Sequence, residues 1–210
     1  MAGDHIIFIV DDDRRVRESL IELLSSFDMH AVSFGSAAEY IASPKPDLPA
    51  CLVLDVQLPD INGLELQTEI AQSDDVPIVF ITAHGDIPSS VRAMKAGAVD
   101  FLTKPFRDQD LLDAVANALE RDRKRREEEK GVAELKAKLE TLTPREREVM
   151  SLVTAGLMNK QVAGEIGVSE ITVKIHRGHV MRKMGARSLA DLVRMAEVLG
   201  VSREKRPAGG

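Results

Sequence analysis

IIFIVDDD, residues 6–13, sets five apolar residues directly before three carboxylates. The same arrangement returns three times along the first half of the chain, where apolar runs end at Asp55, at Thr82 and at Lys104. Strand ends that share one edge of a parallel sheet bring their side chains into a single crevice. The sequence therefore predicts a site where carboxylates, a hydroxyl and an ammonium group face one another.

The predicted crevice carries an excess of negative charge. Carboxylates a few ångströms apart repel strongly, and the single Lys104 offsets only part of that charge. Hard oxygen ligands of this kind favour Mg²⁺, which keeps several waters and takes few protein ligands. We therefore expect a crevice that holds Mg²⁺ and a phosphoryl group. The run of three aspartates could instead cap the following helix, and we assign that role to Asp13 alone.

Apolar runs alternate with amphipathic helical patterns over residues 1–119. The runs are IIFIV, AVSF, CLVL, PIVFI and AVDFL, and the helix after AVSF begins with a capping-box sequence, Ser36 to Glu39. Five such repeats predict an α/β domain with a doubly wound parallel sheet and helices on both faces. No GxGxxG follows the first run, so dinucleotide binding has no support.

The polar residues of this segment follow a known order. They are Asp11-Asp12, Asp55 within DVQLPDING, Thr82-Ala83, Phe101 and Lys104-Pro105. On these residues the segment 5–119 resembles the receiver domain of two-component response regulators. The resemblance implies a flavodoxin-like five-stranded sheet of order 2-1-3-4-5, with Asp55 as the phosphoryl acceptor. It also implies that Asp12, Asp55 and the backbone carbonyl of Gln57 ligate Mg²⁺, with Asp11 acting through water.

The resemblance assigns the remaining residues to phosphoryl binding and to a switch. Lys104 would pair with a phosphoryl oxygen, and Thr82, followed by Ala83, would hydrogen-bond to the phosphoryl group. Phe101 would fill the space that Thr82 vacates, and a cis peptide bond would precede Pro105. These roles agree with the chemistry, because transfer from phosphohistidine needs a carboxylate nucleophile, a divalent cation and a fixed positive charge.

Charge divides the chain into two parts. Residues 1–119 carry 20 acidic and 8 basic side chains, whereas residues 141–210 carry 7 acidic and 12 basic ones. This asymmetry suggests two modules, of which the basic one is a candidate for nucleic acid. No apolar run approaches the ~20 residues of a membrane span, so we expect a cytoplasmic protein with no membrane partner. Cys51, the single cysteine, should be a buried, reduced thiol.

Residues 120–140 join the two parts with charges of both signs and good helix formers. We expect the last helix of the first part to run on into them, with Leu135, Leu139 and Leu142 forming an apolar stripe. A signalling coiled coil and a solvated, partly frayed linker both fit. Residues 120–130 offer no apolar a and d positions, and Gly131 weakens the helix by ~1 kcal/mol relative to alanine.

The basic part indicates four helices. Thr143 to Glu146 form a capping box with proline at the first helical position. Residues 159–184 then indicate two helices separated by a turn at Gly167 to Ser169, with Ser169 as N-cap. Ser188 caps a fourth helix, Leu189 to Leu199. This is helix-turn-helix spacing, in which the second helix enters the major groove of DNA.

The motifs of residues 142–199 are LTPREREV, Gly156, Asn159-Lys160, Ala163, Val168-Ser169, Thr172 to His176, Met181, Lys183-Met184 and Ser188. On these the segment resembles the all-α, four-helix DNA-binding domain of the LuxR, NarL and FixJ type, with the FixJ type as the best overall match. The resemblance implies that Lys174, Ile175 and Gly178 face the groove, and that four further residues reach phosphates, namely Asn159, Lys160, Thr172 and Arg177. His176 and His179 show no cysteine or carboxylate partner in the sequence, which favours packing or phosphate contact over metal binding.

Together these segments predict a phosphorylation-controlled transcription regulator. We expect a receiver domain over 1–119, a charged helical linker over 120–140, a LuxR-type helix-turn-helix domain over 141–201 and a flexible tail over 202–210. The implied partners are a cognate sensor histidine kinase, promoter DNA, a second copy of the chain after phosphorylation, and RNA polymerase.

The alternative is a Mg²⁺-dependent phosphohydrolase of the aspartyl-phosphate type, which Asp11-x-Asp13 after a strand would suggest. A hydrolase would require insertions that recognise its substrate. The hydrolase interpretation also leaves Asp55 and the helix-turn-helix without a role. We therefore expect no enzyme activity beyond slow loss of the protein's own phosphoryl group.

Overall fold

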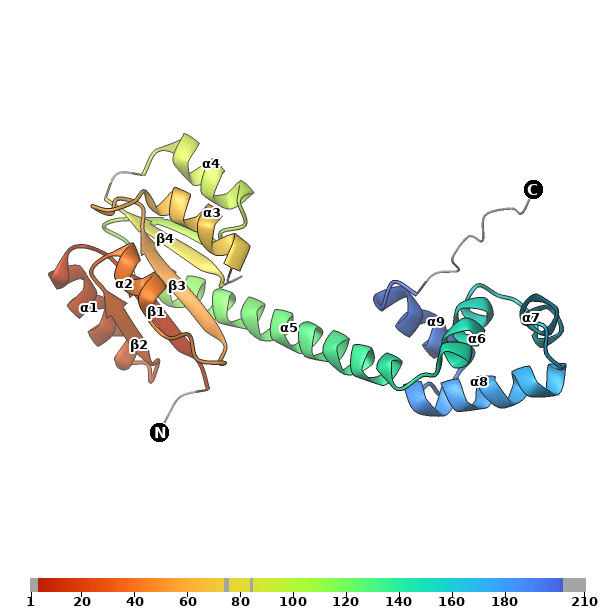
Figure 1. Cartoon of the computed structure of the whole chain (residues 1–210). Coiled ribbons are helices and arrows are strands. Elements are labelled where there is room, and N and C mark those ends of the chain that lie inside the picture. Colours follow the sequence, from red (N-terminus) through yellow and green to blue (C-terminus); the bar gives the residue numbers. More distant parts are fainter. Residues whose placement is uncertain (1–3, 74–75, 84, 202–210) are drawn as a thin grey trace. The chain divides into compact units, whose positions relative to one another are not determined.

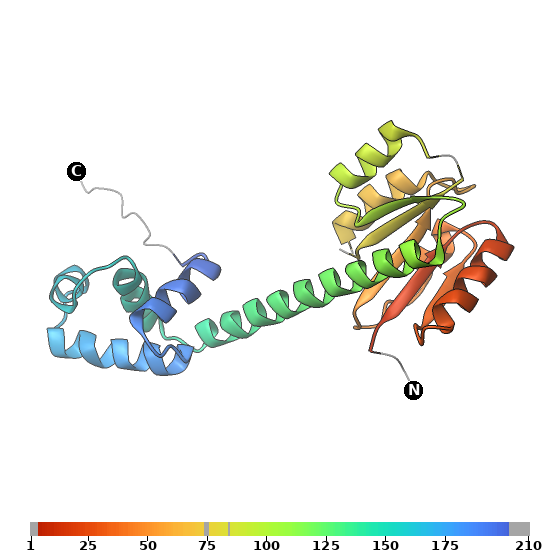
Figure 2. The ribbon, with the colours of Figure 1, turned by 180° about the vertical axis from the view of Figure 1, so that it is seen from behind.

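The computed structural model describes residues 4–73, 76–83 and 85–201. It divides into two compact units, Met1–Arg126 and Glu127–Gly210, which are described separately (Figures 1 and 2). The boundary between the units falls within the segment 120–140, and the predicted tail 202–210 lies outside the described residues.

The first unit is built on a parallel sheet in the order β2-β1-β3-β4-β5. Its strands are β1 (Ile6–Val10), β2 (Ala31–Phe34), β3 (Ala50–Asp55), β4 (Ile78–Thr82) and β5 (Asp100–Thr103). This order confirms the predicted flavodoxin-like, doubly wound sheet. The strand order reverses between β1 and β3, and ligands of such sheets bind beyond the carboxyl ends of the strands at this point.

Helices cover both faces of the sheet, as the near-continuous apolar strands require. On one face α1 (Arg14–Ser25) and α5 (Asp108–Glu140) pack against a core that includes Ile7, Cys51 and Ile81. On the other face lie α2 (Ala37–Ala42), α3 (Gly63–Ser73) and α4 (Ile87–Lys95). Full burial of one such aliphatic side chain contributes about 1.5–3 kcal/mol. The Cys51 thiol is free and buried, as predicted.

The caps of α1 and α2 fix where two of these helices begin. Asp13 caps α1 by accepting a hydrogen bond from the Arg15 amide, which confirms its predicted role. Ser36 caps α2 by accepting from the Glu39 amide. The Glu39 carboxylate accepts from the Gly35 amide rather than from that of Ser36, so the reciprocal bond is displaced by one residue from the predicted capping box.

Helix α5 runs unbroken from Asp108 to Glu140, which confirms that the last helix of the first part continues through residues 120–140. Asp122 anchors it to the sheet, because its buried carboxylate accepts hydrogen bonds from the Ala50 amide at 2.9 Å and from Arg126 Nε at 2.7 Å. Burial alone would raise the pKa of Asp122, but these bonds and those from Arg125 outweigh it and hold the pKa below its ordinary value.

The second unit contains α6 (Pro144–Thr154), α7 (Asn159–Ile166), α8 (Glu170–Met184) and α9 (Leu189–Val198). Thr143 and Glu146 form the predicted capping box at the start of α6. Gly167 ends α7 in the left-handed region, with φ of 68°, and Ser169 then caps α8, which gives the tight turn predicted between these helices. Ser188 caps α9.

Candidate functional site

The carboxyl ends of β1 and β3 gather three aspartates. Asp11 and Asp12 directly follow β1, and Asp55 is the last residue of β3. One carboxylate oxygen from each lies within 4.8 Å of the others. Asp11 and Asp55 are buried, whereas Asp12 is exposed. The structure therefore assembles the acidic crevice that the strand ends predict.

Lys104 brings one positive charge to this crevice from the end of β5. Its Nζ lies 2.7 Å from Asp11 Oδ2 and 2.6 Å from Asp55 Oδ2. Burial lowers the pKa of Lys104, but the hydrogen bonds to Asp11 and Asp55 outweigh it and raise that pKa above its ordinary value. Burial also raises the pKa of Asp11, and Lys104 offsets only part of this. One ammonium group thus pairs with the two buried carboxylates of the crevice.

Gln57 and Ala83 join the aspartates and Lys104 in lining a pocket of about 450 Å³. The Gln57 amide donates to Asp55 Oδ1 at 2.8 Å, which orients the carboxylate. The peptide bond between Lys104 and Pro105 is cis, as the resemblance implies. Of the residues predicted at the crevice, this pocket is lined by Asp11, Asp12, Asp55, Gln57, Ala83 and Lys104.

Thr82 and Phe101, the two predicted switch residues, are not part of the pocket lining. Thr82 is the last residue of β4 and is fully buried. Phe101, on β5, is half-buried and packs against the core, with its ring centroid 6.1 Å from that of Phe80. A Cβ added at Gly85, in the loop after β4, would lie 2.2 Å from Thr103 Cγ2 and 3.4 Å from Phe101 Cε1. Gly85 therefore packs closely against Thr103 and Phe101 of β5.

Two residues to which the sequence assigned no role in the site also shape the crevice. Arg17 donates from Nη1 to the backbone carbonyls of Asp11 at 2.6 Å and Asp12 at 3.0 Å, so the first turn of α1 holds the acidic loop in place. A Cβ at Gly63 would lie 2.5 Å from the carbonyl oxygen of Asp55, so α3 can start against β3 only with glycine there. The arginine shortly after the acidic run and the glycine of DVQLPDING were the available signals.

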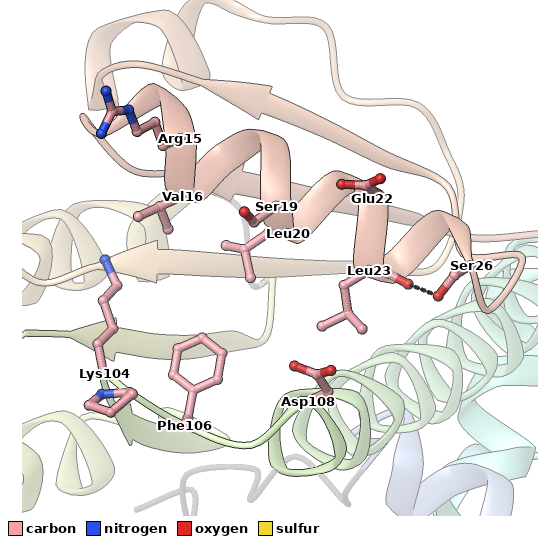
Figure 3. A pocket seen from close by; sticks show the side chains of 11 residues that line it. Arg15, Val16, Ser19, Leu20, Glu22, Leu23, Ser26, Lys104, Phe106 and Asp108 are labelled. Carbon is pink, nitrogen blue, oxygen red and sulfur yellow. Dashed lines mark hydrogen bonds between the residues drawn. The ribbon is translucent and has the colours of Figure 1, made fainter.

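A second pocket, of about 640 Å³, opens between α1 and the turn that leads from β5 to α5 (Figure 3). Val16, Leu20 and Leu23 of α1 face Phe106 across it, and Lys104 reaches its edge. Val16 and Lys104 line this pocket and the acidic crevice alike. An apolar groove therefore lies immediately beside the carboxylates.

Helix α8 presents the residues predicted to face a DNA groove. Lys174, Ile175 and Gly178 are exposed, and the Cβ position of Gly178 has open space around it. Of the predicted phosphate contacts, Lys160 is exposed, Thr172 lies in the first turn of α8, and Arg177 donates to Asn159 Oδ1 at 3.2 Å. The last bond joins the start of α7 to the middle of α8.

Glu146 lies close to His176 and His179 and is a carboxylate partner that the sequence did not reveal. Its Oε1 lies 3.4 Å from His179 Nδ1, and ligand atoms of Glu146, His176 and His179 lie within 4.8 Å of one another. Lys183 Nζ, however, already contacts Glu146 Oε2 at 2.7 Å. This contact is the largest of the influences that lower the pKa of Glu146 to about 2. A metal cation would meet this ammonium group at the same carboxylate, so the cluster holds α6 to α8.

Comparisons with known proteins assign a family to each part of the chain. Residues 7–116 match the response regulator receiver domain family, and residues 140–196 match the luxR family of bacterial regulatory proteins. Nodulation protein W of Bradyrhizobium diazoefficiens is 63% identical over 198 residues, which cover 94% of this chain and 87% of that protein.

Among the described residues no helix has the length and apolarity to cross a membrane.

Two solved structures of full-length regulators are also similar. The response regulator StyR has a TM-score of 0.81 and 47% identity, covering 93% of this chain and 99% of that one. Full-length FixJ from B. japonicum has a TM-score of 0.54 and 38% identity, covering 93% and 97%. The chain therefore belongs to the response regulator transcription factors that join a receiver domain to a LuxR-type DNA-binding domain.

Proposed function

We propose that Asp55 is the phosphoryl acceptor of this response regulator and that its modification controls DNA binding by the second unit. The observation that carries the proposal is the Asp55 carboxylate at the end of β3, held 2.6 Å from Lys104 Nζ and beside Asp11 and Asp12. In the transfer step an Asp55 oxygen attacks phosphorus, the N–P bond of the donor phosphohistidine breaks and an O–P bond forms.

The donor set of the crevice fits Mg²⁺. Its ligands are all oxygens, and among the described residues none forms a hydrogen bond or ion pair with the exposed Asp12 carboxylate, which leaves it available to a cation. Asp12, Asp55 and the carbonyl oxygen of Gln57 would hold the ion directly, and Asp11 would act through water. Bound there, Mg²⁺ would neutralise charge on the phosphoryl oxygens. Lys104, already between Asp11 and Asp55, would pair with one of those oxygens.

Thr82 and Phe101 couple the crevice to the surface of α4. A phosphoryl charge at Asp55 would attract the Thr82 hydroxyl through a charge-assisted hydrogen bond, and Phe101 would move into the space that opens. Ile87, Val91 and Met94 form an exposed apolar stripe on α4, with 79%, 44% and 46% of their surfaces accessible. We assign this stripe, with β5 and α5, to a phosphorylation-dependent homodimer, because an apolar stripe at helical spacing suits a partner surface.

The groove beside α1 is the docking site that we assign to the sensor kinase. The phosphodonor must bring its histidine to Asp55, and the groove shares Val16 and Lys104 with the crevice. Its lining by Leu20, Leu23 and Phe106 suits the apolar face of a helix. Promoter DNA would bind along α8, and RNA polymerase completes the expected partners of a cytoplasmic transcription factor.

Labelling with acetyl phosphate tests the acceptor directly. The wild type should take up about one phosphoryl group per chain in the presence of Mg²⁺, and EDTA should abolish uptake. Asp55→Asn keeps the shape but removes the nucleophile, so it should not be labelled. Asp60→Asn, which changes an exposed carboxylate in the loop after β3, is the matched control and should be labelled normally.

Retained stoichiometric labelling of Asp55→Asn would contradict the assignment. Continuous release of many phosphate ions per chain from a small phosphate ester would instead support the phosphohydrolase alternative, because a receiver reacts once and then loses its own phosphoryl group slowly.

A further inference from the structure

Two isoleucines lie uncovered on one side of α8. Ile171 is 74% exposed and Ile175 is 53% exposed. Residues four apart share one side of a helix, so the two side chains form a single apolar patch over the first two turns. Val173 is fully buried, which places the core on a different side of the helix. Packing within the unit therefore gives no reason for isoleucine at either position.

The same side of α8 continues with features that suit close approach of a polyanion. Lys174 is exposed beside the isoleucines. Gly178 follows one turn later, and a Cβ there would meet no atom within 4 Å. Glycine inside a helix is destabilising relative to alanine, and it permits close approach of another molecule to the backbone. Positive charge next to the patch favours DNA over an apolar protein partner.

The occupant follows from the established DNA-binding family of this unit. In a helix-turn-helix the second helix enters the major groove, and α8 is that helix. Base edges there present hydrogen-bond donors and acceptors, and the C5-methyl group of thymine is their distinctive apolar feature. An aliphatic side chain that packs against such a methyl group removes apolar surface of both from water, which is favourable. Packed against a base edge without a methyl group, it would leave hydrogen-bond donors and acceptors of that edge without a partner, which is costly.

We propose that Ile171 and Ile175 read thymine methyl groups, so that the operator of this regulator carries thymines opposite the first two turns of α8. The inference rests on the proposed function, because it requires α8 to lie in the major groove. It adds Ile171 to the residues expected to face DNA and names the base chemistry that both isoleucines select.

Replacement of single thymines by deoxyuridine provides the test, since this change removes only the methyl group and keeps base pairing. Phosphorylated wild-type protein would first select a binding site from a random duplex library. Each thymine of that site would then be replaced in turn and the dissociation constant measured. Replacement at a contacted thymine should weaken wild-type binding roughly fourfold, from the burial of one methyl group.

Variants locate the effect on each isoleucine. In Ile171→Ala, replacement of the thymine read by Ile171 should no longer weaken DNA binding, whereas replacement of the thymine read by Ile175 should still weaken it. In Ile175→Ala, the two thymines should exchange these responses. Val198→Ala changes an aliphatic residue that is 54% exposed on α9, and it should retain the wild-type response at every thymine. Circular dichroism would establish that each variant is folded.

The outcomes separate this inference from the proposed function. The inference is overturned, and DNA binding is left intact, if binding is sequence-selective but no deoxyuridine replacement weakens it. It is also overturned if a replacement weakens binding by the wild type and by both isoleucine variants equally. Loss of self-association in Ile171→Ala with unchanged affinity for DNA would assign the patch to a second copy of the chain and overturn it as well. Failure of the wild type to select any sequence would overturn both.

Discussion

Lys104 connects the two buried carboxylates of the acidic crevice and so sets its charge. With Nζ 2.7 Å from Asp11 Oδ2 and 2.6 Å from Asp55 Oδ2, it can stabilise both while the exposed Asp12 remains open to a cation. These residues could be predicted from sequence because each stands at the end of an apolar strand. Arg17 could not, because its contact with the carbonyls of Asp11 and Asp12 depends on how α1 leaves β1.

Thr82 provides a test of the switch that spares the acceptor. Thr82→Ala removes the hydroxyl and leaves Lys104 and the three aspartates, Asp55 among them, unchanged, so acetyl phosphate should still label the protein. The phosphorylated variant should dimerise poorly, because nothing draws the end of β4 toward the phosphoryl group. Sedimentation of the labelled wild type and variant measures this, and Thr82→Ser, which keeps the hydroxyl, should behave as the wild type. Normal phosphorylation-dependent dimerisation of Thr82→Ala would contradict the coupling.

Glu146 gives the second unit a stability that depends on pH. Lys183 lowers the folded-state pKa of Glu146 to about 2 from its ordinary value of 4.5. A carboxyl group with a lowered pKa contributes its full stability above the unfolded-state pKa and loses it as the pH falls toward the folded-state pKa. The contribution of Glu146 should therefore be complete above about pH 5 and decline between pH 4.5 and 2.

Glu146→Gln isolates this contribution. The variant should be less stable than the wild type by about 1–3 kcal/mol at pH 6, because it loses a charge-assisted hydrogen bond, and the difference should shrink toward pH 3. Urea titrations followed by NMR signals from α6 and α8 would measure it. An equal difference at pH 6 and pH 3 would show that the Glu146 charge has no part in holding these helices together.

Helix boundaries were the most predictable features at the level of the element. Three helix starts are marked by N-cap side chains that accept hydrogen bonds from free backbone amides, namely those of Thr143, Ser169 and Ser188. Gly167 ends α7 with a left-handed backbone conformation. These signals are local, so the sequence carries them in full. Two contacts are not specified by such local patterns. The bond from the Gly35 amide to Glu39 depends on the turn before α2, and the Glu146–His179 contact depends on how two separate helices pack.

Two basic residues of α8 should differ in what they contribute to DNA binding. Lys174→Ala should cost about 1–3 kcal/mol on a specific site and relax sequence preference at one position. Arg177→Ala should weaken binding to all sequences alike and reduce the salt slope by about one, because it removes a phosphate contact. Arg177 also donates to Asn159, so Asn159→Ala is needed to separate the loss of that bond.

Titration of specific and scrambled duplexes at several salt concentrations would compare these variants. Arg194→Ala, on α9, is a control for the simple loss of an exposed positive charge. Unchanged specific binding by Lys174→Ala would show that Lys174 does not read a base.

The division of the whole molecule followed from charge, since an acidic α/β unit and a more basic helical unit suit different partners. The unbroken course of α5 was also predictable, from its helix formers. Its anchoring by Asp122 was not, because the Ala50 amide that Asp122 accepts from lies 72 residues away in sequence. Long-range contacts of single polar groups leave no periodic pattern in a sequence.

Phosphorylation should act on DNA binding through the joining of two chains. A single helix-turn-helix unit binds weakly, whereas two units held by a receiver dimer can read two half-sites about one helical turn apart with a raised effective concentration. The modification should therefore change affinity for a paired site far more than for an isolated half-site.

The most direct measurement is the dissociation constant for a paired site and for a half-site, with and without acetyl phosphate and Mg²⁺. For the wild type, phosphorylation should tighten binding to the paired site at least tenfold more than to the half-site, by an order-of-magnitude estimate from the effective concentration. Asp55→Asn should show no response on either duplex. Equal tightening on both duplexes, or a full response in Asp55→Asn, would contradict the claim that phosphorylation of Asp55 controls DNA binding by pairing two chains.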